Sequence, residues 1–333
     1  MMYAFIEAPM KIITPLITLV FIMLLLPGCK STSGDKSSIT QSDHSEGIEK
    51  QLTDEPNAGT QGDIEQESVE DGTAEQGTTE EGDTEQEDTE QGAWYRPSPL
   101  ITWHIQLSGS INTSHDAELY DIDLFDSPAS LIQELQGSGI KVICYFSAGS
   151  YEDWRSDAGS FKANDLGNTL DGWPGERWLD IRSENVRAIM TKRLDLAKSK
   201  GCDGVDPDNM DGYTNQPGMN LTAEDQLAYN RFIANEAHAR MLAVGLKNDV
   251  DQINELVRYF DFAVNEQCFE YSECSTMEPF ITANKPVFNI EYQQKYVNRS
   301  LALQTLCSDS INKQFSTLVL PLELNDEFRL SCQ

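Results

Sequence analysis

From Ala93 to the end of the chain, short apolar runs alternate with longer helix-like stretches. The apolar runs predict strands that are buried on both faces, as in a parallel sheet. They are "TWHIQL" (102–107), "KVICYFS" (141–147), "RWLDI" (177–181), "DGVDPD" (203–208), "MLAVGLKN" (241–248), "FDFAVNE" (260–266), "PVFNIEY" (286–292) and "STLVLPLEL" (316–324). Helices are predicted for "SPASLIQELQGSG", which has a serine cap and a terminal glycine, for "SENVRAIMTKRLDLAKSKG" and for "TAEDQLAYNRFIANEAHAR".

This alternation predicts an α/β fold with a parallel sheet, and eight units predict that the sheet closes into a (β/α)8 TIM barrel. The segment 93–333 is about 240 residues long, close to the roughly 250 residues typical of such barrels. A doubly wound open sheet is the main alternative. However, no Gly-x-Gly-x-x-Gly motif follows any of the apolar runs, so nothing indicates a dinucleotide, and we expect no cofactor.

The first 29 residues have the features of a targeting segment. The apolar run from Ile12 to Leu26 is shorter than the roughly 20 residues that span a bilayer. It ends in "LPGC", which is typical of a bacterial lipoprotein signal in which Cys29 is lipidated. Glu7 stands where positive charge is expected, which favours Met10 as the translation start. An uncleaved membrane anchor is the alternative, and both place the globular part outside the cytoplasm.

Residues 30–92 are polar and acidic, with 19 Asp or Glu against 3 Lys. Such a segment cannot bury enough apolar surface to offset its conformational entropy, so it predicts a disordered, extended tether. A spacer from a membrane and a solubilising tail are both compatible with it. The net charge of the whole chain, -31, argues against a nucleic-acid partner and favours a cationic one.

Seven cysteines are present, and six remain if Cys29 is lipidated. An even number in an exported domain suggests disulfides. Local spacing favours Cys268 with Cys274 and Cys307 with Cys332, whereas Cys144 is as compatible with a buried free thiol. No Cys-x-x-Cys pair exists and no histidine lies at ligand spacing from a cysteine, so we expect no metal.

Polar groups follow several of the predicted strands. Asp208 and Asn209 follow one strand, "KND" (247–249) the next, "NEQ" (265–267) the one after, and "EY" (291–292) the next again. In a barrel these carboxyl ends meet at one face, where active sites form. The sequence therefore predicts a site crowded with carboxylates.

The motifs "VICYFSAGSYEDWR", "GWPGERWLDIRS", "GCDGVDPDNMDGY", "GLKND" and "FAVNEQCFEY" resemble glycoside hydrolase family 114, the endo-α-1,4-polygalactosaminidases, from Trp103 to about Tyr292. The resemblance implies a barrel enzyme that cuts internal linkages in polymers of α-1,4-linked galactosamine. It also implies that Asp208 and Glu266 are the catalytic pair.

The residue chemistry agrees, because glycoside hydrolysis commonly needs one protonated and one ionised carboxyl group. Glu266 is favoured as the acid, since hydrogen bonds beside Asn209 would keep Asp208 ionised. The stereochemical outcome stays open.

Further residues complete the predicted site. We expect ammonium groups of the substrate to contact Asp121 or Asp123, Asp211 and Glu291. Sugar rings would stack on Trp173, Tyr213, Tyr145 and Tyr292, of which the last two could equally be packing residues. Lys247 would hold a catalytic carboxylate ionised, and Asn209 and Asn265 adjoin the pair. Asp206 lies one layer deeper, needs a partner such as Lys247 and is the alternative to Asp208 as the catalyst.

The expected partner is a cationic, galactosamine-rich polysaccharide, bound by a monomer that is held to a membrane through Cys29. Two other functions remain open at this point. One is a non-catalytic barrel that binds amino sugars, and the other is a hydrolase of a different cationic amino-sugar polymer.

Overall fold

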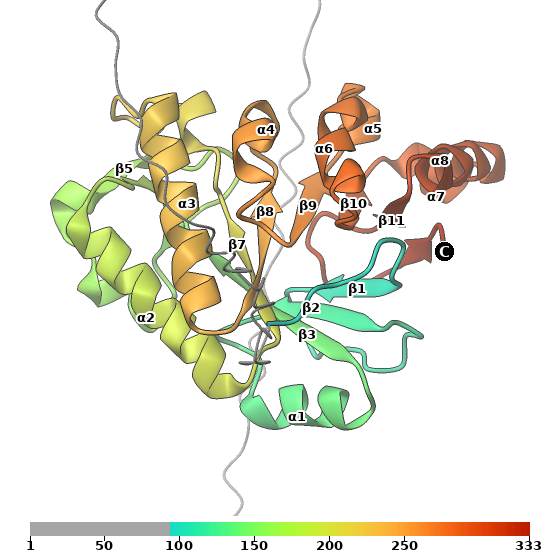
Figure 1. Cartoon of the computed structure of the whole chain (residues 1–333), viewed down its shortest axis with the longest axis horizontal. Coiled ribbons are helices and arrows are strands. Elements are labelled where there is room, and N and C mark those ends of the chain that lie inside the picture. The colour runs from blue at the N-terminus through green and yellow to red at the C-terminus, as the bar shows by residue number, and fades with distance from the viewer. Residues whose placement is uncertain (1–93) are drawn as a thin grey trace, which may run out of the picture. The chain divides into compact units, whose positions relative to one another are not determined.

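The structure is a computed structural model that describes residues 94–333 (Figure 1). The predicted signal segment, the lipidation of Cys29 and the acidic tether of residues 30–92 fall outside the described residues. Those three interpretations remain predictions.

Eight parallel strands form the main sheet, and the predicted α/β barrel architecture is confirmed. In spatial order they are β1 (Trp103–Gln106), β2 (Leu119–Asp123), β3 (Lys141–Ser147), β7 (Gly204–Asp208), β8 (Ala243–Lys247), β9 (Phe262–Glu266), β10 (Val287–Glu291) and β11 (Phe315–Val319). A short strand, β12 (Leu330–Ser331), then pairs antiparallel with β11. The sheet curls so that the carboxyl ends of these strands lie at one face (Figure 1).

Side chains join β1 to β11 on the side where the two strands meet. The Trp103 indole nitrogen donates to the Ser316 carbonyl oxygen at 2.9 Å, and the Ser316 hydroxyl donates to the Ile101 carbonyl oxygen at 2.9 Å. Arg329, just before β12, donates to the Trp103 carbonyl oxygen at 2.7 Å. The described ladder pairs do not link β1 with β11, so these contacts complete the barrel.

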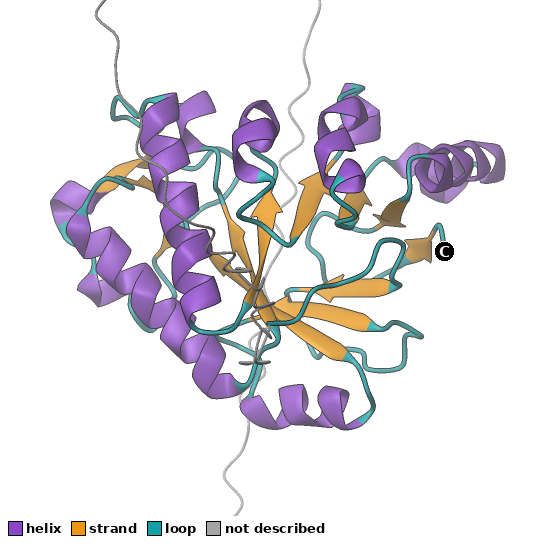
Figure 2. Ribbon diagram, viewed as in Figure 1, coloured by secondary structure: helices purple, strands orange, loops and turns teal. Residues whose placement is uncertain are grey.

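Helices cover the outside of the strands (Figure 2). They are α1 (Ala129–Gly137), α2 (Glu184–Lys200), α3 (Ala223–Ala239), α4 (Ile253–Leu256), α5 (Cys268–Tyr271), α6 (Glu278–Thr282), α7 (Gln294–Asn298) and α8 (Ser300–Asn312). The three predicted helices are α1, α2 and α3. Ser183 caps α2 through the Val186 amide, and Gly201 ends it at a φ of 89°. The predicted serine cap of α1 is wrong, because Pro128 holds that position. Among residues 94–333, no helix has the length and apolarity to cross a membrane.

One predicted barrel strand was assigned wrongly. The run "RWLDI" contributes to β6 (Glu176–Leu179), which belongs to a separate antiparallel sheet with β4 (Ser150–Glu152) and β5 (Leu166–Thr169). The second barrel strand is instead β2, "LYDID". Both segments mix apolar with charged residues, so the local pattern does not show which one joins the barrel. The segment of β2 was not recognised as a buried strand because two of its five residues are aspartates.

The interior of the barrel is apolar toward the amino ends of the strands, here called the lower end, and polar toward their carboxyl ends, here called the upper end. Trp103, Phe262, Phe288 and Leu318 form part of the inner apolar cluster. Gly245 makes room for this cluster, since a Cβ there would overlap the Phe262 ring. A second cluster fills the space between strands and helices. The polar side chains at the upper end therefore rest on a tightly packed floor.

Three disulfides are present in the described residues: Cys144–Cys202, Cys268–Cys274 and Cys307–Cys332. The first joins β3 to the segment between α2 and β7, so Cys144 is not a free thiol. The second closes a short loop after β9, and the third fastens the C-terminal strand to α8. All three hold segments that surround the barrel strands.

Candidate active site

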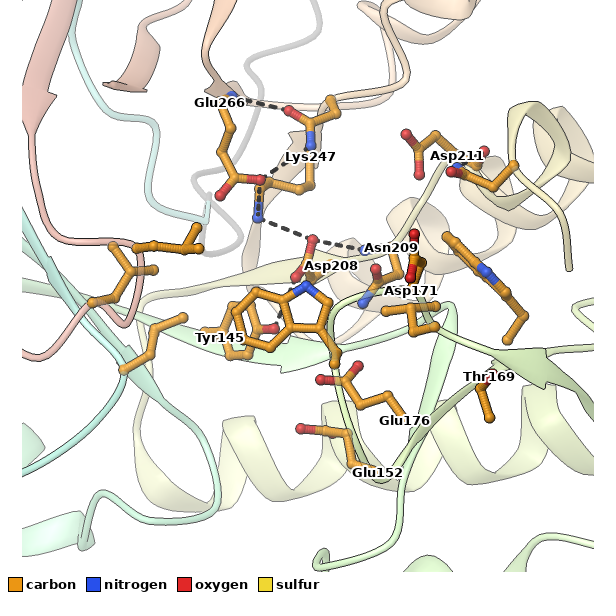
Figure 3. Close-up of a pocket in the computed structure, with 18 of the residues that line it drawn as sticks. Tyr145, Glu152, Thr169, Asp171, Glu176, Asp208, Asn209, Asp211, Lys247 and Glu266 are labelled. Atoms are coloured by element: carbon orange, nitrogen blue, oxygen red, sulfur yellow. Dashed lines mark hydrogen bonds and ion pairs between the residues drawn. The ribbon is translucent and has the colours of Figure 1, made fainter. Parts of the chain in front are cut away.

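A cavity of about 1070 Å³ opens at the carboxyl ends of the barrel strands. Its lining comes from the ends of β3, β7, β8 and β9, from the sheet formed by β4, β5 and β6, and from residues 322–324. The small sheet thus forms a wall of the cavity, although it is not part of the barrel. Figure 3 shows Asp208, Lys247 and Glu266 at the centre of this cavity.

Asp208 is the last residue of β7, directly after Pro207, which cannot donate to a sheet ladder. Its Oδ1 accepts from Lys247 Nζ at 2.9 Å and from the Asn209 amide at 2.7 Å, and its Oδ2 accepts from the Tyr145 hydroxyl at 2.8 Å. Burial favours the neutral acid, but Lys247 and these donors outweigh it and hold the pKa of Asp208 below its usual value. Asp208 is therefore ionised.

Glu266 is the last residue of β9 and its side chain is 25% exposed. Its Oε2 lies 3.3 Å from Lys247 Nζ and accepts from Asn248 Nδ2 at 3.3 Å. The Tyr292 hydroxyl donates to the other oxygen, Oε1. Asn248 also accepts from the Glu266 backbone amide at 3.0 Å, which fixes where the strand ends. Glu266 thus faces the cavity with one side free.

Lys247 is 4% exposed and contacts both carboxylates. Burial alone would lower its pKa, but the charges of Asp208 and Glu266 raise the pKa well above its usual value. Because Asp208 Oδ1 and Glu266 Oε2 contact this nitrogen at 2.9 Å and 3.3 Å, the two oxygens are no more than about 6 Å apart. One ammonium group therefore holds the two carboxylates close together.

Asp206 and Asp121 lie one layer deeper, away from the cavity lining. Asp206 is 0% exposed, and among the described residues its carboxylate contacts no donor other than the carboxyl group of Asp121. Burial raises the pKa of Asp206 to about 7, and burial together with Asp206 raises the pKa of Asp121 well above its usual value. Two predictions are corrected here, because Lys247 contacts the upper carboxylates instead of Asp206, and Asp121 faces Asp206 instead of substrate.

The structure brings six of the other predicted residues to the cavity and leaves Tyr213, Asn265 and Glu291 outside its lining. The lining includes Asp123, Tyr145, Trp173, Asn209, Asp211 and Tyr292. Tyr145 and Tyr292 hold the carboxylates with their hydroxyl groups, whereas the Trp173 side chain is 47% exposed at the rim. Tyr213 does not line the cavity, although its neighbours Asp211 and Thr214 do.

Three further residues that were predicted to contact substrate hydrogen-bond within the protein. The carboxylate of Asp123 accepts from both terminal nitrogens of Arg155, at 3.0 Å and 2.6 Å. Glu291 is 0% exposed and accepts from the Phe269 amide at 2.9 Å, which secures the start of α5. Asn265 is 1% exposed and donates to Asn248 at 3.3 Å. Each of these groups hydrogen-bonds to a neighbouring segment of the protein and so supports the site.

Sequence reasoning missed the residues that β4 and β6 contribute. Glu152, Trp154, Asp171 and Glu176 all line the cavity. Glu152 and Trp154 lie a few residues after the end of β3. The segments of Asp171 and Glu176 carry no strand-end signal of the barrel type, so the pattern that located Asp208 could not locate those two. The motif "SYEDW" was the available sequence signal, and only its place beside the barrel face makes it part of the site.

One group of side chains in the described part of the chain has the composition of a metal site. Ligand atoms of His104, His115 and Asp326 lie within 4.8 Å of one another. His115 already contacts Asp326 at 2.8 Å. Burial lowers the pKa of His104, and the charges of His115 and Arg329 lower it further. None of the three lines the cavity, so they add nothing to its chemistry.

Comparison with known proteins agrees with this geometry. The family model described as Glycoside-hydrolase family GH114 matches residues 84–333. The crystal structure of Aspergillus fumigatus Ega3 in complex with galactosamine is 48% identical, with a TM-score of 0.69, and the match covers 72% of this chain and 98% of that one. The glycoside hydrolase domain of PelA from Pseudomonas aeruginosa is 14% identical, with a TM-score of 0.57, over 70% and 98% of the two chains. That second likeness concerns the fold alone. No curated protein sequence matches the chain.

Proposed function

The chain belongs to glycoside hydrolase family 114, and on that premise we propose that it is an endo-acting enzyme that cleaves α-1,4 linkages in galactosamine-containing polysaccharide. The observation that carries the proposal is the pair Asp208 and Glu266, which share Lys247 at the open end of the barrel. Such a pair can supply the acid and the nucleophile that glycoside hydrolysis needs.

We assign the nucleophile to Asp208 and the acid to Glu266. Asp208 is held ionised by Lys247 and Tyr145, so it can attack the anomeric carbon. Glu266 faces the cavity and would give its proton to the glycosidic oxygen as that bond breaks. Water then attacks the glycosyl ester, Glu266 takes the proton of that water, and Asp208 leaves as a carboxylate.

A retaining outcome follows from the assignment of Asp208 as nucleophile. The nearest oxygens of the two carboxylates lie no more than about 6 Å apart because both contact Lys247, which is compatible with the roughly 5–5.5 Å between the carboxyl groups of retaining enzymes.

The substrate class follows from the charge of the cavity and from the relative that binds galactosamine. Asp211 lines the cavity, and no lysine or arginine in the described residues forms an ion pair with it. Burial and the charge of Asp208 raise the pKa of Asp211 to about 6, so it is largely ionised at neutral pH. It is suited to contact an ammonium group, and Trp173 offers an exposed ring face for an adjoining sugar.

Sizing of reaction products tests the enzyme function. Wild-type protein incubated with deacetylated galactosaminogalactan should release short oligomers, whose initial anomeric form by NMR should match that of the substrate. Asp208→Asn and Glu266→Gln should release none while still binding the polymer. A wild-type protein that binds the polymer and releases nothing would support the non-catalytic barrel. If the protein released products from a different amino-sugar polymer and none from deacetylated galactosaminogalactan, the enzyme would be a hydrolase of that other polymer.

We also propose that the enzyme acts outside the cytoplasm, anchored through a lipid on Cys29 and spaced from the membrane by residues 30–92. The "LPGC" motif and the acidic composition of that segment support this placement. Fractionation of cells tests it. Wild-type protein should pellet with membranes, and Cys29→Ala should either leave the membrane fraction or accumulate unprocessed.

A further inference from the structure

Two glutamates stand opposite each other in the small sheet that walls the cavity. Glu152 of β4 and Glu176 of β6 are direct partners in the antiparallel ladder. They are 2% and 8% exposed, and Figure 3 shows them side by side below Asp208. Like charges in directly opposed positions destabilise a sheet, more so when water is excluded. The two residues deal with this cost in different ways.

Glu152 is compensated by the protein itself. Its Oε1 accepts from Arg155 Nε at 2.8 Å and lies 2.7 Å from Arg155 Nη2. Its Oε2 lies 3.5 Å from Arg193 Nη1. Arg155 also binds Asp123, and Arg193 also binds Asp157. Both arginines are therefore fully engaged by carboxylates other than Glu176.

Glu176 has no such cation. Among residues 94–333 its hydrogen-bond donor is the Ser150 hydroxyl, at 2.6 Å from Oε2, and no lysine or arginine forms an ion pair with it. Its other oxygen, Oε1, accepts no hydrogen bond from those residues, and the side chain lines the cavity. The structure thus leaves one nearly buried carboxylate facing the substrate space without a positive partner.

Hydrogen bonds place Glu176 beside the proposed nucleophile. The Ser150 hydroxyl lies 2.6 Å from the Ser147 hydroxyl, which accepts from Asn209 Nδ2 at 2.9 Å. The backbone amide of Asn209 donates to the Asp208 carboxylate. Both carboxylates line the same cavity, so a sugar whose anomeric carbon reaches Asp208 would direct a neighbouring substituent toward Glu176.

We propose that Glu176 binds the ammonium group of a galactosamine unit next to Asp208 and so selects free amino sugars over N-acetylated ones. The assignment rests on the proposed function. An ammonium ion supplies both the positive charge and the hydrogen-bond donors that Glu176 lacks. An acetamido group offers neither the charge nor the compact size. If Glu176 were protonated, it would need no cation. Binding of the ammonium group therefore depends on the protonation state of Glu176.

Burial, together with the charges of Glu152 and Asp208, raises the pKa of Glu176 to about 7, while Ser150 and Arg155 act in the opposite direction. An arriving ammonium group would lower that pKa and release a proton. Binding should therefore weaken as pH falls and Glu176 becomes protonated. Asp211, whose pKa burial raises to about 6, titrates in the same cavity, so the pH test needs a variant as well.

The test compares wild type, Glu176→Gln and Glu152→Gln on deacetylated and partly acetylated polymer. Glu176→Gln keeps the shape and the Ser150 contact but removes the charge. We expect its KM on deacetylated polymer to rise roughly tenfold to a hundredfold, the effect of losing one charge-assisted hydrogen bond. Its kcat should change far less, and its preference for deacetylated over acetylated polymer should shrink.

Thermal unfolding separates this role from a structural one. Glu176→Gln should unfold at the same temperature as wild type or higher, because cross-strand repulsion is removed. Glu152→Gln should unfold at a lower temperature, because it removes a buried carboxylate partner from both Arg155 and Arg193. A lower unfolding temperature for Glu176→Gln with no change in substrate preference would show a structural role and overturn the assignment.

Calorimetry of small probes keeps the inference distinct from the proposed function. Galactosamine should bind wild type more tightly than galactose does, and Glu176→Gln should lose that difference even if no polymer is ever cut. Between about pH 8 and about pH 5.5, galactosamine binding should weaken more in wild type than in Glu176→Gln. Equal galactosamine affinity in the two proteins would refute the inference while leaving the hydrolase intact.

Discussion

Two carboxyl pairs occupy successive layers of the same barrel, and they differ in charge. Asp208 and Glu266 share the ammonium group of Lys247, and the pKa of Asp208 lies below its usual value. Two residues earlier on the same strand, Asp206 faces the carboxyl group of Asp121, and burial raises the pKa of Asp206 to about 7. The upper layer holds an ionised carboxylate because a cation contacts Asp208, whereas the lower layer is closer to neutral.

The position of one lysine accounts for the difference in pKa between Asp208 and Asp206. Lys247 is at the last residue of β8, which is the level of the upper pair. Desolvation acts on both layers, since Asp206 and Lys247 are 0% and 4% exposed. The direct ammonium contact lowers the pKa of Asp208, whereas burial without such a contact raises the pKa of Asp206.

The largest expected effect comes from Lys247→Met, which removes the difference between the layers. Two partly buried carboxylates would lose their partner, which should lower the free energy of unfolding by up to roughly 3 kcal/mol. Activity should fall roughly 10²–10³-fold, and the acid limb of kcat/KM should move to higher pH as the pKa of Asp208 rises. Lys141→Met is the control, because Lys141 pairs with Asp203 while 45% exposed. Wild-type activity in Lys247→Met would contradict the role of the shared cation.

Asp206→Asn should sharpen the comparison through pH dependence. The raised pKa means that native Asp206 keeps its proton between about pH 4 and about pH 7 while the unfolded chain has lost it. Wild-type stability from this group therefore falls as pH rises through that window, by roughly 1.4 kcal/mol per pH unit. The amide does not titrate, so the variant should gain on wild type over the same window in urea unfolding experiments. Parallel stability curves would show that Asp206 is not protonated.

A smaller effect is expected from Tyr145→Phe, which removes a single donor from the upper layer. The Tyr145 hydroxyl contacts Asp208 Oδ2 at 2.8 Å, and a hydrogen bond to a charged group contributes roughly 1.5–3 kcal/mol. We expect kcat/KM to fall roughly tenfold to a hundredfold, with its acid limb at higher pH. Tyr292→Phe removes the hydroxyl that donates to Glu266. In this variant the acid limb of kcat/KM, which reports Asp208, should stay at the same pH. Identical pH profiles for both variants would argue against separate roles.

The smallest effect is expected at the opposite end of the same strand. Asp203 accepts from Lys141 at 2.9 Å and Gln136 at 2.8 Å, near the start of β7. Asp203→Asn should cost about 1 kcal/mol in the free energy of unfolding and leave kcat/KM unchanged. A large loss of activity there would mean that the two ends of β7 are coupled.

Much of the barrel and the central pair could be predicted from the sequence. Seven of the eight barrel strands, the three long helices and the end of β7 at Asp208 follow from local periodicity, capping and the position of Pro207. The sheet β4–β6 and its glutamates could not, because their place beside the cavity depends on contacts between distant segments. Asp121, Asp123 and Glu291 were predicted to touch substrate, since nothing local reveals that a neighbour already occupies each of them.

By itself, the sequence determined which residue types stand at the strand ends, since side-chain alternation and backbone chemistry act over a few residues. Only the tertiary structure decided their charge. Lys247 sits between Asp208 and Glu266, Asp206 is left with Asp121, and Glu152 takes the arginines that Glu176 lacks. Protonation is governed by burial and by partners brought together across the barrel, and neither is a property of any short stretch of chain.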